Sequence, residues 1–346
     1  MHVGEVMLGL YPLPSTTMRL LVTGGAGFIG SNFVRYWREA QPDGHVVVLD
    51  VLTYAGVPAN LEGTGVQLVK GDIANLELVE EILRRESIDV VVNFAAESHN
   101  SLAVLDPARF FRTNVMGTQS LLEASRRAGL ERFHHISTCE VYGDLDLDTD
   151  DVFTEESPYR PRTPYNASKA AADHAVRSYH ETFGLPVTIT NCSNNYGPRQ
   201  FPEKVIPRFA ALALDDRPLT LYASTTHKRE WLHVLDHCRA IERVLVDGVV
   251  GATYNVGSGI EATVEEIADL VLDALGKPAS LKTIVPDRPG HDRRYLLDSS
   301  RIRSELGWKD EVPFDEGVRA TVQWYADNRA WWEPLLDRAP VNERWS

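Results

Sequence analysis

A glycine-rich run, Gly24-Gly25-Ala26-Gly27-Phe28-Ile29-Gly30, constrains the fold of this chain more than any other feature. An aliphatic stretch at 19–22 precedes the run, and a stretch with helical spacing at 28–40 follows it. In a strand–loop–helix unit of this kind, the glycines let the backbone approach a pyrophosphate, and the helix N-terminus supplies N–H groups. Three glycines at this spacing are weak evidence alone, but their place between a strand and a helix predicts a dinucleotide site.

The dinucleotide can be specified further from Asp50, which ends the next predicted strand at 45–50. A carboxylate at this position accepts hydrogen bonds from both hydroxyls of the adenosine ribose and repels a 2′-phosphate. No lysine or arginine follows in Val51-Leu52-Thr53-Tyr54. The sequence therefore predicts NAD rather than NADP as the cofactor.

Short apolar runs alternate with helical stretches through the first half of the chain. Strands are predicted at 19–22, 45–50, 66–70, 89–95, 133–137 and 187–191, and helices at 28–40, 76–85, 108–127 and 165–183. This alternation is typical of an α/β fold with a Rossmann-type, doubly wound parallel sheet.

The pattern loosens after residue 195, where glycine and proline separate shorter elements. Helices are predicted at 204–214, 234–246, 263–275 and 314–328, and strands at 219–222 and 253–256. We therefore expect a flexible extension at 1–17, an NAD-binding domain at 18–195 and a smaller C-terminal α/β substrate lobe at 196–346. Some segments of this lobe are allowed to return to the Rossmann sheet.

Composition excludes several classes of function. The formal net charge is −14, and an acidic surface repels phosphate backbones, so nucleic acid is not an expected partner. Three cysteines form no disulfide framework and indicate a reducing cytoplasm, while no apolar stretch reaches membrane-spanning length. Residues 1–17 lack the basic start of a signal peptide. The acidic segment 144–151 is predicted to be a solvated loop without a metal site.

The catalytic candidates are Tyr165 and Lys169, which lie four residues apart and so on one face of a predicted helix. An ammonium group beside a phenol stabilises the phenolate and lowers its pKa, which lets the tyrosine remove a hydroxyl proton. Thr138, at the end of the preceding predicted strand, can hydrogen-bond the same hydroxyl. Because Tyr-x-x-x-Lys is common by chance, the interpretation depends on the glycine run.

Longer motifs add a resemblance that covers residues 19 to about 325. They are Leu52-Thr53-Tyr54-Ala55-Gly56, Ala95-Ala96-Glu97-Ser98-His99, Phe133-His134-His135-Ile136-Ser137-Thr138, Glu140-Val141-Tyr142-Gly143, Asn191-Cys192-Ser193-Asn194-Asn195-Tyr196-Gly197-Pro198, Phe201-Pro202-Glu203-Lys204 and the run from Asp287 to Tyr295. With these motifs the chain resembles an extended short-chain dehydrogenase/reductase, and within that group the dTDP-glucose 4,6-dehydratase family.

The resemblance implies a reaction and a set of roles. In that family a tyrosine and NAD oxidise the sugar at carbon 4, a glutamate removes the proton on carbon 5, an aspartate protonates the hydroxyl leaving carbon 6, and the hydride returns to carbon 6. By motif position the catalytic residues are Thr138, Cys139, Glu140, Tyr165 and Lys169. Helices 108–127 and 165–183 match those that pair across a twofold axis in the family, so a homodimer is expected.

Two binding sets are predicted, partly from the motifs. The cofactor set is Gly24, Gly27, Phe28, Ile29, Gly30, Asp50, Leu52, Thr53, Asp72, Ile73, Ala95, Ala96, Ser98, Thr113, Tyr165, Lys169 and Asn195. The set for a nucleotide-diphosphate sugar is His99, Asn194, Lys204, Val205, Leu221, Tyr222, Arg229, Arg288 and His291. Arginine and lysine in this second set supply positive charge that the acidic surface lacks.

The sequence departs from the family at two places. Cys139 stands where the family has the aspartate acid, and His99-Asn100-Ser101-Leu102-Ala103 stands where it usually has His-Val-Asp-Arg-Ser. A thiol is mostly protonated at neutral pH but is a poorer acid than a tuned carboxyl group. Cys139 is either a substitute acid or a space-filling residue, and a water or the Tyr165 hydroxyl are other sources of the proton. A covalent nucleophile is less favoured, because the motif shows no dedicated base.

The Thr138-Cys139-Glu140 triplet also resembles that of the UDP-N-acetylglucosamine 5,6-dehydratase of tunicamycin biosynthesis. An enzyme of that kind returns the hydride to carbon 4 and leaves an exocyclic alkene. Four functions follow in order: a nucleotide-sugar 4,6-dehydratase, a 5,6-dehydratase, a 4-epimerase, and an NAD-binding protein that has lost catalysis. The resemblance suggests deoxysugar or antibiotic biosynthesis, although the residues do not fix the nucleobase, the sugar or the pathway.

Overall fold

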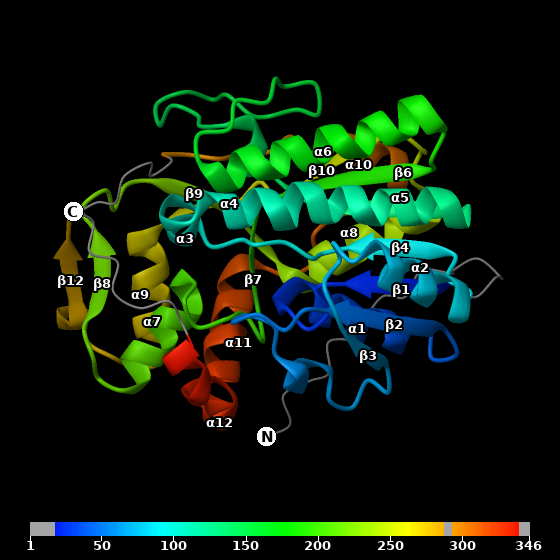
Figure 1. Cartoon of the computed structure of the whole chain (residues 1–346). Coiled ribbons are helices and arrows are strands. Elements are labelled where there is room, and N and C mark those ends of the chain that lie inside the picture. The colour runs from blue at the N-terminus through cyan, green and yellow to red at the C-terminus, as the bar shows by residue number, and fades with distance from the viewer. Residues whose placement is uncertain (1–17, 287–292, 339–346) are drawn as a thin grey trace.

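The computed structural model describes residues 18–286 and 293–338, and its centre is a sheet of seven parallel strands (Figure 1). The spatial order of the strands is β10-β6-β5-β4-β1-β2-β3. Their bounds are β1 Arg19–Thr23, β2 His45–Asp50, β3 Gln67–Lys70, β4 Val90–Asn93, β5 Arg132–Thr138, β6 Val187–Cys192 and β10 Thr253–Val256. The Rossmann-type parallel sheet predicted from the sequence is confirmed.

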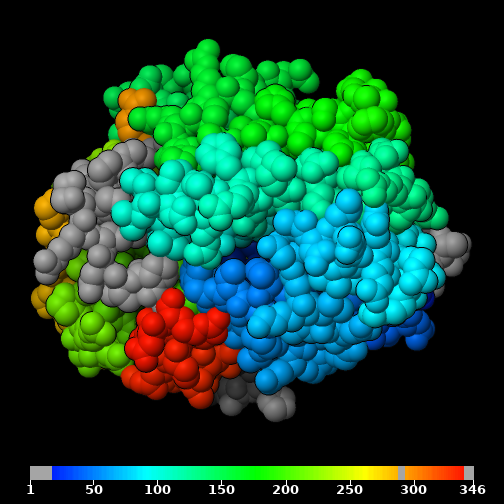
Figure 2. All heavy atoms as spheres, in the orientation of Figure 1, coloured from blue at the N-terminus to red at the C-terminus, as the bar shows by residue number. Residues whose placement is uncertain are grey.

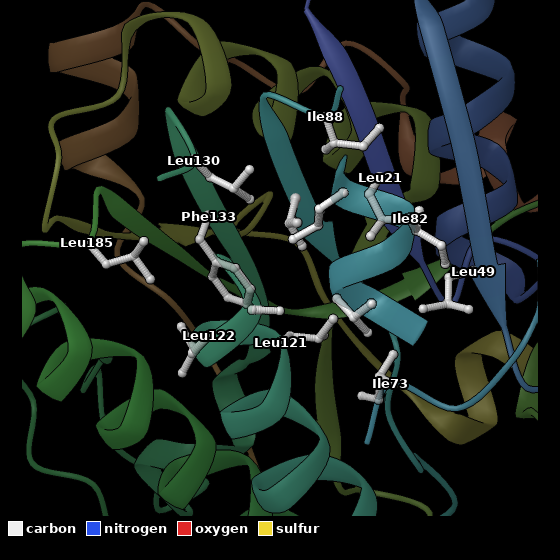
Figure 3. Packing of buried hydrophobic residues seen from close by; sticks show 14 of the residues in the cluster. Leu21, Leu49, Ile73, Ile82, Ile88, Leu121, Leu122, Leu130, Phe133 and Leu185 are labelled. Carbon is white, nitrogen blue, oxygen red and sulfur yellow. The ribbon is translucent and has the colours of Figure 1, made fainter. Parts of the chain in front are cut away.

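Alternating side chains on each strand separate two apolar clusters, one on each face of the sheet. On β1, Leu21 packs in one cluster, while Leu20 and Val22 pack in the other. This division follows from the period of two along a strand, and burial on both faces explains the nearly continuous aliphatic runs. Figure 3 shows the first cluster, in which Leu21 and Phe133 of the sheet meet Ile82 and Leu121 of the covering helices.

Helices cover both faces of this sheet. Residues of α2, α5 and α6 belong to the Leu21 cluster, and residues of α1 and α8 belong to the Leu20 cluster. Their bounds are α1 Phe28–Ala40, α2 Leu76–Arg85, α5 Thr118–Ala128, α6 Pro164–Phe183 and α8 Val234–Asp247. The chain therefore has the doubly wound arrangement, in which a ligand binds beyond the carboxyl ends of the strands.

A second group of elements, mostly from the C-terminal half, packs around a separate core that contains Tyr196, Trp231, Tyr325 and Trp332. Its helices are α7 Val205–Leu214, α9 Val264–Ala274, α11 Phe314–Asp327 and α12 Arg329–Trp332. Its strands are β7 Asn194–Tyr196, β8 Leu219–Tyr222, β9 Lys228–His233, β11 Glu261–Thr263 and β12 Lys282–Val285. They form a three-stranded sheet, β11-β9-β7, and the β8–β12 pair at the far left of Figure 1.

Some C-terminal segments lie with the Rossmann sheet. Strand β10 is its edge strand beside β6, and α8 packs against α1. Helix α10 Ser300–Leu306 contributes Ile302 and Leu306 to a cluster shared with β10. The structure also contains short 3-10 helices: η1 Pro58–Leu61, η3 Cys139–Tyr142, η4 Ala279–Leu281 and η5 Glu333–Arg338.

The predicted helix 108–127 is not a uniform α-helix. It consists of α4 Pro107–Phe110, a π-helical segment η2 Phe111–Gly117 and α5, and a further helix, α3 Asn100–Leu105, precedes it. Asn114 in the π segment accepts a hydrogen bond from the Glu97 N–H at 2.8 Å and donates to the Glu97 carbonyl and to Ser168 Oγ. A π segment inserted in an α-helix often marks a functional site.

The acidic segment 144–151 is a loop, but the prediction that it is solvated is wrong for Asp144. The Asp144 side chain is 4% exposed and accepts hydrogen bonds from Arg162 at 2.6 Å and from the Arg293 Nε at 2.7 Å. Although burial acts to raise the pKa of this carboxyl, the hydrogen bonds from Arg293 and from the Arg294 backbone lower it. Arginines far along the chain bind the Asp144 carboxylate and hold the loop in place. The local sequence of the loop does not predict these ion pairs.

Candidate active site

The glycine run forms a tight turn between β1 and α1, and its glycines are needed for close packing. Gly24 has φ +68°, and a Cβ atom there would lie 2.6 Å from the backbone nitrogen of Ala95. A Cβ atom on Gly30 would lie 2.5 Å from the Gly24 carbonyl oxygen. Helix α1 begins after Gly27 with no side-chain cap and no acidic residue in its first turn. This helix N-terminus is suited to an anion such as a pyrophosphate.

Asp50 joins the end of β2 to the glycine run. Its carboxylate accepts hydrogen bonds from the Ala26 N–H at 3.0 Å and from the Leu52 N–H at 2.8 Å. Leu52 has a left-handed backbone, φ 57°, and its side chain packs against the Leu20 cluster. Leu52 is not among the residues that line the cavity, and its N–H positions Asp50, so its place in the cofactor set stays a prediction.

One cavity of about 1370 Å³ extends from this turn into the C-terminal lobe. A pocket for one drug-sized ligand typically has a volume of about 300–1,000 Å³, so this larger space suits two ligands side by side. In Figure 2 the blue N-terminal atoms lie between the cyan helices and the red C-terminal helices. Among the predicted residues, the cavity is lined by Gly24, Gly27, Phe28, Ile29, Gly30, Asp50, Thr53, Asp72, Ile73, Ala95, Ala96, Ser98, His99, Thr113, Thr138, Glu140, Tyr165, Lys169, Asn194, Asn195, Lys204, Val205, Tyr222 and Arg229.

Helix α6 presents Tyr165 and Lys169 to this cavity, as their spacing predicts. Thr163 caps the helix by accepting a hydrogen bond from the Asn166 N–H, and Pro164 occupies its first turn. Burial raises the pKa of Tyr165 well above its usual value, and a hydrogen bond with Thr138 opposes that rise. Desolvation of the phenolate is the largest cause of this rise, so the lowering of this pKa by Lys169 stays a prediction.

Behind Lys169 lies a buried polar group that the motifs alone did not predict. The Lys169 ammonium donates to the Ile136 carbonyl at 2.7 Å and lies 3.3 Å from His135 Nε2. The same His135 nitrogen lies 3.4 Å from Asp173 Oδ1, and the Asp173 side chain has no exposed area. Burial lowers the pKa of Lys169, and the negative charge of Asp173 raises it. Asp173 is one further helical turn from Lys169, a spacing visible in the sequence.

Glu140 follows Thr138 at the start of η3 and lines the cavity. The Asn100 amide, on α3, donates a hydrogen bond to Glu140 Oε2 at 3.2 Å. Asn100 itself lines the cavity, although it was absent from the predicted site. The departure of the chain from the family motif at 99–103 is the sequence signal from which Asn100 could have been found.

Cys139 is not among the residues that line the cavity, which favours its space-filling role over that of a substitute acid. The side chain is fully buried in an apolar cluster with Val141, Tyr142 and Leu297. Burial raises the pKa of its thiol well above the usual value, and the Glu140 charge raises it further. The side chain points into the protein because η3 turns immediately after Thr138.

The predicted substrate residues fall into three groups. Arg229 and Lys204 line the cavity, and the Arg229 guanidinium stacks 5.0 Å from the Tyr295 ring. Leu221 is 1% exposed, packs in the core of the C-terminal lobe and is not among the cavity residues, so the structure gives its prediction as a substrate contact no support. On β8 successive side chains alternate sides, and its neighbours Thr220 and Tyr222 face the cavity instead. Arg288 and His291 lie outside the described residues.

Two buried acids in the cavity wall were also not predicted. Glu97 accepts a hydrogen bond from the Arg109 Nε at 2.8 Å, so the two charges compensate. Glu203 accepts from the Tyr54 hydroxyl at 3.1 Å and lies 3.6 Å from His99 Nε2. Both acids sit inside quoted motifs, but a motif does not state which of its members face a ligand.

Comparison with known proteins agrees with this geometry. The family model described as GDP-mannose 4,6 dehydratase matches residues 21–321. The fold and the site define an extended short-chain dehydrogenase/reductase, and structures of this type include the UDP-glucose 4-epimerase of Thermus thermophilus in complex with NAD. That epimerase is 34% identical, with a TM-score of 0.83 over 90% of this chain and 100% of the other.

The chain belongs more narrowly to the dTDP-glucose 4,6-dehydratase family. The Streptomyces niveus enzyme of that name is 48% identical over 326 residues, which cover 92% of this chain and 96% of the relative. A crystal structure of the Streptomyces venezuelae dTDP-glucose 4,6-dehydratase, with NAD bound, has a TM-score of 0.88 and 48% identity. It matches 92% of this chain and 100% of the other. Within residues 18–286 and 293–338, no helix is long and apolar enough to cross a membrane.

Proposed function

We propose that this protein is an NAD-dependent dehydratase of a nucleotide-diphosphate sugar, with dTDP-glucose as the first substrate to test. The observation that carries the proposal is a single cavity in which Thr138, Glu140, Tyr165 and Lys169 meet the glycine turn. The turn and Asp50 suit NAD, because the packing around Gly24 and Gly30 excludes side chains where a pyrophosphate approaches. Arg229 and Lys204 offer positive charge to the diphosphate of the sugar nucleotide.

The oxidation step is assigned to the residues on β5 and α6. Bound NAD supplies the hydride acceptor and donor for the sugar. Tyr165 accepts the proton of the hydroxyl on carbon 4, and Thr138 holds that hydroxyl by a hydrogen bond. The Lys169 ammonium stabilises the phenolate form of Tyr165. Asp173, buried behind Lys169, helps to keep the lysine charged.

The elimination step is assigned to Glu140. A ketone at carbon 4 acidifies the proton on carbon 5, and the Glu140 carboxylate removes it, so that the hydroxyl on carbon 6 leaves as water. This hydroxyl needs a proton from a group in the cavity. Cys139 does not supply it, because its thiol is buried outside the cavity and holds its proton tightly.

That placement of Cys139 favours a second candidate, a nucleotide-sugar 5,6-dehydratase that forms an exocyclic alkene. No carboxylic acid stands beside Glu140 in the triplet, so the pocket lacks the acid of the 4,6-dehydratase family at that position. The two candidates share the oxidation and the elimination and differ only in the carbon that finally receives the hydride.

Substrate deuterated at carbon 4 tests these assignments. We expect dTDP-glucose or UDP-N-acetylglucosamine to lose water, with the label followed by mass spectrometry and NMR. Label at carbon 6 establishes 4,6-dehydration, whereas label retained at carbon 4 with loss of water establishes the 5,6-dehydratase. Label retained without loss of water and with inverted stereochemistry would establish epimerisation. No reaction with any nucleotide sugar would overturn the enzymatic proposal.

We also propose that the protein is a cytoplasmic homodimer. Phe111, Met116 and Phe183 on the η2–α6 face are exposed although large and apolar, which suits a self-complementary interface. All three cysteines are free and buried, as suits a reducing compartment. Light scattering that gives a monomer mass at micromolar concentration would contradict the dimer.

A further inference from the structure

Cys139 and Asn100 both depart from the family motif, and both lie next to the Glu140 carboxylate, one along the chain and one in space. On one side of Glu140, Cys139 replaces an aspartate, and on the other side Asn100 replaces the valine of the usual motif. The structure separates their roles, because Cys139 is turned into the apolar cluster while Asn100 faces the cavity. Asn100 donates a hydrogen bond to the Glu140 carboxylate.

Asn100 connects Glu140 to the start of the catalytic helix. Its amide nitrogen donates to Glu140 Oε2 at 3.2 Å, and its amide oxygen accepts from the Thr163 hydroxyl at 3.3 Å. The Thr163 hydroxyl in turn accepts from the Asn166 N–H at 3.2 Å, as the N-cap of α6. Helix α3, which begins at Asn100, lies against α6.

All donors in this chain of hydrogen bonds point toward the carboxylate. The chain begins at the N-terminus of α6, a helix of 20 residues whose dipole places partial positive charge at that end. Hydrogen bonds that run in one direction polarise each other, so the partial positive charge at the helix N-terminus strengthens the bond that Asn100 donates to Glu140. A donor to the charged form of a carboxylate favours ionisation, and an ionised Glu140 is the form that can take a proton from carbon 5.

We propose that Asn100 is a positioning residue for Glu140, holding its carboxylate oriented and ionised through the bonds that run from the α6 N-cap. This inference rests on the proposed dehydratase function. It assigns to Asn100 a role that the valine of the family motif cannot perform, since a valine has no hydrogen-bond donor.

Among the described residues, three titratable groups interact electrostatically with Glu140. They are the Tyr165 phenol on α6, the Cys139 thiol on η3 and the Cys192 thiol on β6. Burial raises the pKa of each of the three, that of Cys192 to about 12. The Asn100 amide differs from these groups because it does not titrate and donates a hydrogen bond directly to the carboxylate.

The test compares Asn100→Val, Asn100→Asp and Thr163→Val with the wild type. For Asn100→Val we expect kcat to fall roughly ten- to hundredfold with KM nearly unchanged, because a hydrogen bond to a charged group is lost. The acidic limb of kcat/KM should move to higher pH by roughly one unit. Asn100→Asp should move the acidic limb further to higher pH, because it replaces the amide donor with a second carboxyl group. Thr163→Val should move the acidic limb less, because the bond from Asn100 to Glu140 remains.

A second measurement separates the two chemical steps. Oxidation does not involve Glu140, so absorbance at the nicotinamide band should still rise in a single turnover of Asn100→Val and then decay more slowly than in the wild type. Val104→Ala is the control, because Val104 lies on the same helix, is 48% exposed and is not a cavity residue. Thermal melting and NAD content identify a variant that has not folded.

An active wild type together with an Asn100→Val enzyme of unchanged kcat and unchanged acidic limb would overturn the role of Asn100 alone. If Asn100→Val does not fold, the isosteric Asn100→Asp and Thr163→Val serve as the test. An acidic limb of kcat/KM that is unchanged in both would then overturn the role of Asn100. A wild type that acts on no nucleotide sugar would overturn the proposed function and this inference with it.

Discussion

At the scale of single residues, Cys139 and Glu140 are adjacent in the sequence but lie in different surroundings. Cys139 is fully buried and Glu140 faces the cavity. We therefore expect Cys139→Ala to keep kcat within roughly threefold, since the thiol makes no contact with substrate, and to cost about 1 kcal/mol of stability through a small cavity. Steady-state kinetics and urea unfolding measure the two effects. A hundredfold loss of kcat in a folded variant would show that the thiol reaches the sugar.

The same position tests whether the pocket can be returned to the family pattern. Cys139→Asp would place a carboxyl group in an apolar cluster next to Glu140, where burial and like charge both oppose its ionisation. We expect lower stability and no gain in 4,6-dehydration, measured by melting temperature and product NMR. A clear gain would mean that the missing acid alone limits this reaction.

Asp173 is the residue whose charge supports Lys169. Removing it in Asp173→Asn keeps an oxygen that can accept from Ser137 and Tyr159, whose hydroxyls both lie 2.8 Å from Asp173 Oδ2, but deletes the negative charge. Because Asp173 holds up the pKa of Lys169 against burial, the ammonium should be lost at lower pH in the variant. The alkaline limb of kcat should move downward, and the unfolding free energy should fall by about 3 kcal/mol. A profile identical to that of the wild type would leave Asp173 with a structural role only.

At the scale of elements, the sequence predicted those parts that have strong local periodicity. The bounds of α1, β2, α2, β8 and β10 agree with the structure residue by residue. The strands β7, β9, β11 and β12 were not predicted, because segments of three to six residues gain their stability from partners far along the chain. The motifs located the cavity residues well, whereas Leu52, Cys139 and Leu221 show that a motif does not fix which way a side chain points.

The π segment η2 is held by hydrogen bonds to residues outside it. Asn114 satisfies both backbone groups of Glu97 and is 1% exposed. Asn114→Ala leaves a buried N–H and a buried carbonyl without these bonds, so we expect a loss of about 2–4 kcal/mol of stability. Ser168→Ala, which removes only the third bond of Asn114, should cost less. Denaturant unfolding distinguishes them, and equal losses would contradict this account.

At the scale of the whole molecule, the Rossmann sheet and the C-terminal lobe meet at Glu230 on β9. Its carboxylate accepts hydrogen bonds from the Gly259 N–H at 2.7 Å, just after the edge strand β10, and from the Leu297 N–H at 3.0 Å. Burial raises the pKa of Glu230 to about 7, against the two backbone hydrogen bonds that lower it. This junction therefore changes its charge near physiological pH.

The stability of the molecule should respond to that change with a definite sign. Because the folded pKa is raised, the folded state binds the proton more tightly than the unfolded state, and the resulting stability is present below the unfolded pKa of about 4.5 and is lost as pH rises through about 7. The unfolding free energy should thus fall between about pH 4.5 and pH 7, more steeply in the wild type than in Glu230→Gln. Glu81→Gln, at a side chain 56% exposed on α2, should keep the wild-type slope. Urea titrations at each pH measure the slopes, and equal slopes in the wild type and Glu230→Gln would show that the carboxyl at the junction stays ionised throughout.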